Sequence, residues 1–61
     1  MLHTAIKKSL DEQKGIMLYL RGGQTIPLVV SQINTDKTIE GRNQDHDYIV
    51  VLTSDISAVA I

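Results

Sequence analysis

The residues with the clearest capacity for chemistry are Asp45, His46 and Asp47, which follow one another in a polar stretch. A carboxylate beside an imidazole can orient it for base catalysis or metal binding. Adjacent residues in a strand point to opposite faces, however, and in an exposed loop they are not held in a fixed arrangement. The other histidine, His3, is distant in the sequence, so a metal site would need ligands from a second subunit. We therefore expect a solvated loop, with no metal and no cofactor.

Nucleophilic catalysis and phosphate binding also lack the residues that they need. Gly22 and Gly23 are not followed by the lysine and helix of a phosphate-binding loop. No serine has a histidine near it in the sequence to act as a base, and the serines are Ser9, Ser31, Ser54 and Ser57. We expect that the protein is not an enzyme.

The size and charge of the chain restrict its function further. It has 61 residues, which predicts one domain over residues 1–61 with marginal stability. Disulfides, metals or oligomerisation usually stabilise such domains, and the chain has no cysteine, so oligomerisation is favoured. The formal net charge of −1 gives no overall positive field for nucleic acid, so such binding needs a local patch. No apolar run approaches the ~20 residues of a membrane span, and we expect a cytoplasmic protein without a membrane partner.

The N-terminal stretch predicts an amphipathic helix over about residues 2–14. Apolar residues recur at helical spacing from Leu2 to Leu10, and charged residues occupy the opposite positions. Gly15 follows at a position where a left-handed cap is usual, so the helix should end there.

From Ile16 the apolar period changes from 3.6 to 2, which indicates strands. A three-residue loop over 21–23 would pair Leu18 with Ile26 and place Gly23 in the left-handed conformation. A two-residue loop would pair Leu18 with Pro27 instead, against the hydrophobic pattern. The five expected strands cover about residues 16–21, 24–33, 37–41, 47–53 and 56–61.

The second of these strands should bend strongly. Its apolar residues switch from one face to the other, as expected where one strand serves two halves of a small barrel. Pro27 cannot donate to a ladder, so it must lie at an edge, at a bulge or at the bend itself.

The last third of the chain is apolar on both strand faces, over residues 48–52 and 56–61. In so small a domain something must cover the second face, and we infer that other copies of the chain do so. The residues predicted to form this interface between copies are Tyr48, Val50, Leu52, Ile56, Val59 and Ile61.

The order of a short helix, a hairpin closed by Leu-x-x-Gly, a long bent strand and two final strands resembles the Sm-like family, including its LSm and Hfq branches. The closest local similarities are residues 16–23 and 55–60. The resemblance implies a mainly β, SH3-type five-stranded small barrel with an N-terminal α-helix. It also implies that the fourth strand pairs with the fifth strand of the next subunit in a closed ring of about five to seven copies.

Sm-like rings bind single-stranded RNA in loops near the pore, after the second strand and between the fourth and fifth. The RNA-binding residues implied here are Asn34, Thr35, Asp36, Thr53 and Ser54, to which we add Lys7 and Lys8 on the helix surface. Adjacent lysines on an exposed helix are usually only solvated. Thr53 and Ser54 also stand where the family carries Arg-Gly or Lys-His. The alternative is therefore an assembly scaffold or protein-interaction module that uses the same ring without nucleic acid.

Overall fold

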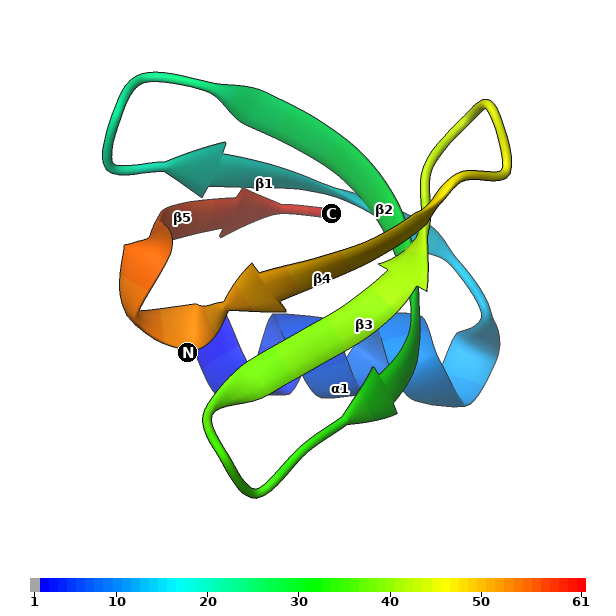
Figure 1. The fold of residues 1–61 in the computed structure, drawn as a ribbon. Helices are drawn as coiled ribbons and strands as arrows, with labels where there is room; N and C mark the ends of the chain where they lie inside the picture. Colours follow the sequence, from blue (N-terminus) through cyan, green and yellow to red (C-terminus); the bar gives the residue numbers. More distant parts are fainter. Residues whose placement is uncertain (1) are drawn as a thin grey trace.

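The computed structural model describes residues 2–61, with side chains from Thr4 onward. It contains one helix followed by five strands, which form a single antiparallel sheet in the order β4-β3-β2-β1-β5 (Figure 1). This confirms the predicted mainly β architecture with an N-terminal helix. The elements are α1 (Leu2–Glu12), β1 (Gly15–Leu20), β2 (Thr25–Ile33), β3 (Thr38–Arg42), β4 (Tyr48–Leu52), the 3-10 turn η1 (Thr53–Asp55) and β5 (Ile56–Ala60).

The helix ends earlier than the sequence predicts. Gln13, not Gly15, takes the left-handed conformation after the last turn, with φ of 56°. The N–H of Lys14 then donates to the Ser9 carbonyl at 3.3 Å, which is the closing bond of a Schellman cap. Gly15 is instead the first residue of β1, where it pairs with Val29. The predicted cap at Gly15 is wrong because Gly15 pairs with Val29 in the sheet. The predicted role of the Leu2 side chain lies outside the described residues.

A buried serine fastens this helix end to the sheet. Ser9 is 1% exposed, and its hydroxyl donates to the Lys14 carbonyl at 2.5 Å. The same oxygen accepts the backbone N–H of Val30 in β2 at 3.1 Å. The Lys14 carbonyl and the Val30 N–H at this junction therefore both have a hydrogen-bond partner without water.

The β1–β2 hairpin has the predicted register. Leu18 pairs with Ile26 and Ile16 with Leu28, and Gly23 has φ of 88°. The two-residue loop is thus excluded. Leu18–Ile26 and Ile16–Leu28 are the hydrogen-bonded pairs of this hairpin, so the nitrogen of Pro27, which lies between them, points away from β1. On its other side, β3 pairs with β2 only from Val29 onward. Pro27 therefore lies on an edge segment of β2.

The predicted bend of β2 is present as a register shift against β3 between Val30 and Gln32. Across this bend β3 approaches closely at Gly41. A Cβ on Gly41 would overlap the backbone carbonyl of Val29. The close approach therefore requires glycine at this position.

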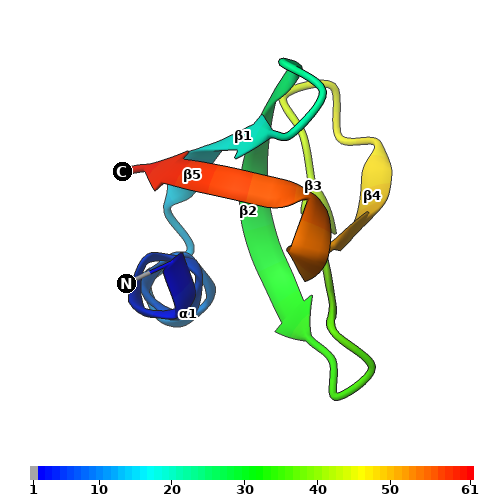
Figure 2. The same cartoon turned by 90° about the vertical axis from the view of Figure 1, so that its left-hand side faces the viewer.

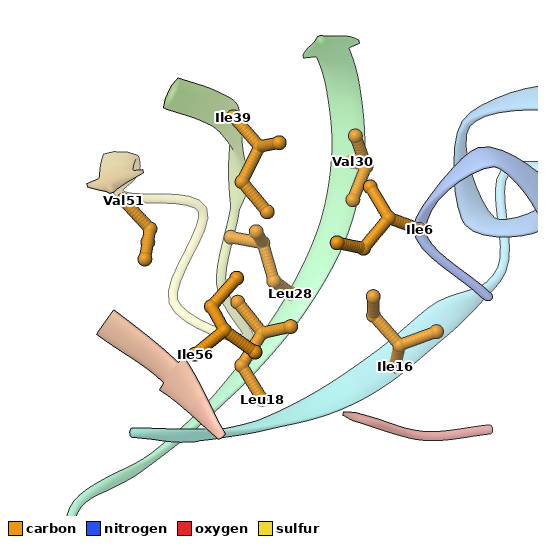
Figure 3. Close-up of a cluster of buried hydrophobic side chains, with 8 residues drawn as sticks. All are labelled: Ile6, Ile16, Leu18, Leu28, Val30, Ile39, Val51 and Ile56. Carbon is orange, nitrogen blue, oxygen red and sulfur yellow. The ribbon is translucent and has the colours of Figure 1, made fainter. Parts of the chain in front are cut away.

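The sheet is strongly curved, and α1 packs against β2, β5 and β1 (Figure 2). The hydrophobic core lies inside the curve of the sheet, where Ile6 of α1 joins side chains from the strands. Figure 3 shows side chains from α1 and from every strand converging on it. β1 and β2 supply alternate residues to the core, as the period of 2 predicts, and β3, β4 and β5 supply one residue each. The core residues are Ile6, Ile16, Leu18, Leu28, Val30, Ile39, Val51 and Ile56. Within the described residues, no helix is long and apolar enough to cross a bilayer.

Candidate functional site

The two loops that the sequence predicts at an RNA site meet in the structure. The N–H of Thr53, at the start of η1, donates to the carbonyl of Lys37 in the β2–β3 loop at 2.9 Å. The Thr53 hydroxyl donates to the same carbonyl at 3.0 Å. Lys37, at the end of the loop, has φ of 68°, which is the left-handed conformation. Residues 34–36 and 53–54 thus belong to one continuous surface.

Asn34 organises this surface rather than presenting a free side chain. Its amide nitrogen donates to the Thr38 hydroxyl at 2.9 Å and to a carboxylate oxygen of Glu40 at 2.5 Å. Its amide oxygen accepts from Gln32 at 2.5 Å. The Thr38 hydroxyl in turn donates to Asp36 at 2.6 Å. Because the Asn34 amide is used on both sides, it holds the loop in shape.

Glu40 and Tyr48 extend this network to the edge strand β4. The Tyr48 hydroxyl donates to Glu40 Oε1, while Asn34 binds the other carboxylate oxygen. The tyrosine hydrogen bond, followed by that of Asn34, lowers the pKa of Glu40 below its usual value. The same bond from Glu40 raises the pKa of Tyr48. This pair could not be predicted from the sequence, because it depends on the β3–β4 register.

The charge at the loops is predominantly negative. Asp36, Glu40 and Asp55 lie in or beside them, against two cations, Lys37 in the β2–β3 loop and Arg21, whose backbone N–H donates to the Asp55 carbonyl at 2.9 Å. The surface therefore offers a phosphate backbone little positive charge from one copy of the chain.

Lys7 and Lys8 lie on α1, not in these loops. Both are exposed on the outer face of α1, near Asp11 and Glu12. The helix packs mainly on β2, β5 and β1, and Figure 2 shows it on the side of β2 opposite β4. Within one copy the structure therefore does not bring the two lysines to the loops.

The predicted interface residues fall into two groups. Tyr48, Val50 and Leu52 form an exposed apolar row on the outward face of β4, which we call the β4 stripe. In the second group, Val59 of β5 is half-buried against the core, and Ile61, directly after β5, is 71% exposed. Ile56 is only 4% exposed and belongs to the core of the chain itself, so it adds nothing to an exposed interface.

The loop of Asp45, His46 and Asp47 is shaped by its own backbone. The side-chain oxygen of Asn43 accepts the N–H groups of Asp45 and Asp47 at 2.9 and 3.0 Å. Arg42 donates to the His46 carbonyl at 2.9 Å. Over the described part of the chain, no three His, Asp or Glu side chains are grouped to hold a metal ion.

Comparison of the chain with protein-family models, with curated proteins and with solved structures finds no match.

Proposed function

We propose that the protein is an Sm-like module that assembles with copies of itself through its two end strands. The observation that carries this proposal is the β4 stripe, whose Tyr48, Val50 and Leu52 are 52%, 56% and 51% exposed. β4 pairs only with β3, so it is an edge strand of the sheet. An apolar edge of this kind is a template for strand pairing.

The backbone N–H and C=O groups of the β4 stripe are not used in pairing with β3. Thr53 donates its N–H to the Lys37 carbonyl at the end of the β3–β4 pair. Hydrogen-bonded and non-bonded pairs alternate along antiparallel strands, so positions 49, 51 and 53 bond to β3. The N–H and C=O groups of the β4 stripe therefore point to the free edge.

β5 offers the complementary edge. Leu20 donates its N–H to the Gln24 carbonyl, so even-numbered residues of β1 bond to β2 and odd-numbered ones to β5. The β5 partners of the odd-numbered residues are Ala58 and Ala60. Val59 lies between them and therefore directs its backbone N–H and C=O away from β1.

The directions of the free backbone groups on β4 and on β5 favour one antiparallel register between copies. Backbone groups on the two free edges must face each other, which sets Val50 of one copy opposite Val59 of the next. The same register sets Tyr48 opposite Ile61 and uses the whole length of β4. A shift by two residues in either direction leaves one end of β4 unpaired. Because opposed residues share a face, the apolar side chains meet directly.

A contact between two different edges is heterologous, so repetition produces a ring where the rotation closes. The bent β2 and the resemblance to Sm-like proteins favour a closed ring of about five to seven copies. The native mass of the purified protein at micromolar concentration tests this. A single oligomer of that size is expected, whereas a well-folded monomer would contradict the proposal.

Cross-linking tests the register separately, since the chain has no cysteine of its own. A mixture of the single variants Val50→Cys and Val59→Cys should form an intermolecular disulfide under mild oxidation, because opposed Cα atoms lie about 5.5 Å apart. Tyr48→Cys mixed with Val59→Cys is the matched control. Equal cross-linking of both mixtures would contradict the register.

A second candidate function is single-stranded RNA binding by the assembled ring. The observation that favours it is the meeting of the β2–β3 loop with η1 at Thr53 and Lys37. A ring would repeat this surface, together with Lys7 and Lys8, around its axis, and multivalency would strengthen weak contacts.

Fluorescence anisotropy with labelled single-stranded oligonucleotides at two salt concentrations tests RNA binding. Binding through phosphates should weaken steeply with salt, and Lys8→Glu should reduce it about equally for all sequences. Lys37→Gln tests the loops in the same way. If the ring forms and binds no RNA at low salt, the alternative of an assembly scaffold is favoured, in agreement with the negative charge of the loops.

A further inference from the structure

An open hollow of about 400 Å³ lies over the first halves of the β1–β2 pair. Its floor includes Met17, Pro27 and Val29, which are half-buried and alternate with core residues along their strands. Ala60, the last residue of β5, and Ile61 after it line one side. The volume lies within the range of small-molecule sites, which is about 300–1,000 Å³. No residue of the β4 stripe lines the hollow, whereas Arg42 and Asn43, which shape the loop of Asp45 to Asp47, lie at its edge.

The polar residues of the hollow are gathered in one segment of the chain. They are Arg42, Asn43 and Gln44, at the end of β3 and the start of the following loop. Within the described residues, Arg42 is the single charged side chain among those that line the hollow. The hollow is therefore apolar over most of its surface and cationic at one place.

The guanidinium of Arg42 is held in position by its neighbours. One of its N–H groups donates to the His46 carbonyl at 2.9 Å, and its central carbon lies 5.3 Å from the centre of the Tyr48 ring. These contacts use one nitrogen and one face of the group, which leaves further N–H donors for a ligand.

Asn43 adds to the same polarity. Its side-chain oxygen already accepts two backbone N–H groups of its own loop. The part of the side chain left for a ligand is the NH₂ group, which can only donate. Hydrogen-bond donors thus predominate at this end of the hollow, and donors suit an anion.

We propose that the hollow binds a medium-chain fatty carboxylate. Its alkyl chain would lie along Met17, Pro27 and Val29, and its carboxylate would pair with Arg42 and receive a hydrogen bond from Asn43. Arginine binds carboxylates with two parallel hydrogen bonds, and methionine adapts to a flexible chain. All of these groups come from one copy of the chain, although Ile61, at the side of the hollow, also belongs to the edge proposed for self-assembly.

Titration of the protein with decanoate, followed by amide chemical shifts in NMR spectra below the micellar concentration, tests this. Saturable shifts are expected at Gly15, Met17 and Val29 and in the β3–β4 loop. Each methylene removed from the ligand should weaken binding about two- to fourfold, since apolar burial scales with area. Decanol and decyltrimethylammonium should bind about tenfold more weakly, because they lack the anion. Equal binding of all three ligands would overturn the proposal.

Substitutions separate the hollow from other apolar surfaces. Arg42→Gln should weaken decanoate about tenfold and leave decanol unchanged, while Lys37→Gln, at a remote exposed cation, should change neither. Gly15→Leu should fill the hollow, because a Cβ there meets only Val29 Cγ2 at 3.9 Å. The proposal fails if decanoate binds folded Arg42→Gln and Gly15→Leu variants with full affinity, or if its shifts map to the β4 stripe.

Discussion

Val50→Asp should dissociate the proposed assembly and leave the chain folded. Val50 is 56% exposed in the single chain, so a carboxylate at this position would stay hydrated there. In the proposed pairing the same carboxylate would lie opposite Val59 of the next copy. It would be buried without a cationic partner, which is unfavourable for a charged group.

The size of the effect follows from these two surroundings. Loss of the buried half of a valine side chain costs about 1 kcal/mol, and an unpaired charge in a strand interface costs about 3 kcal/mol more. A total of about 4 kcal/mol weakens one interface about a thousandfold. Each copy in a ring takes part in two such interfaces, so micromolar protein should be monomeric.

The assay compares native mass with thermal unfolding monitored by circular dichroism. Val51→Asp is the matched control, because Val51 is the next residue but is 6% exposed and belongs to the core. It should unfold the chain, whereas Val50→Asp should keep its secondary structure. Val59→Asp should also break the assembly, but it is less selective because Val59 packs partly on the core. A Val50→Asp variant that keeps the full oligomer would refute the assignment of β4 as an interface strand.

Three further predictions concern the fold. Ser9→Ala should lower the free energy of unfolding by about 2–3 kcal/mol, because it leaves the buried N–H of Val30 without a partner. Urea denaturation measures this. The exposed Ser31→Ala is the control, and an equal loss of stability there would contradict the prediction. Gly41→Ala should lower the free energy of unfolding by about 3 kcal/mol, because the added Cβ overlaps the backbone of β2. A variant as stable as the parent would show that β3 can move away. Tyr48→Phe should lower the unfolding temperature at neutral pH. Since the Tyr48 bond lowers the pKa of Glu40, its stabilisation is present above the usual value of 4.5 and is lost as the pH falls through the lower folded pKa. The difference from the parent should thus shrink below pH 4.5, and a constant difference would refute the link.

Much of the fold could be predicted because its signals are local. The change of apolar period at Ile16 separates helix from strands, and the Gly22–Gly23 turn fixes the hairpin register through the hydrophobic pattern. The switch of apolar faces in β2 indicates its bend, because a side-chain pattern with period 2 can change face only where the backbone is irregular.

The helix end was predicted wrongly because two elements compete for one residue. Gly15 is a good helix cap by type, but β1 uses it opposite Val29, and Gln13 takes the left-handed position instead. Ile56 has the composition of an interface residue but is buried in the core. Neither outcome can be derived from spacing alone, because each depends on contacts with residues distant in the sequence.

The sequence by itself determined the element order, the hairpin register and the apolar character of the last two strands. These follow from periodicity and turn chemistry, which act over a few residues. The tertiary structure alone decided which residues of β4 face outward, that Asn34 and Tyr48 both bind Glu40, and that Arg42 stands at the edge of an apolar hollow. These features depend on how β3 pairs with β2 and β4, including a close approach at Gly41 that no local pattern encodes.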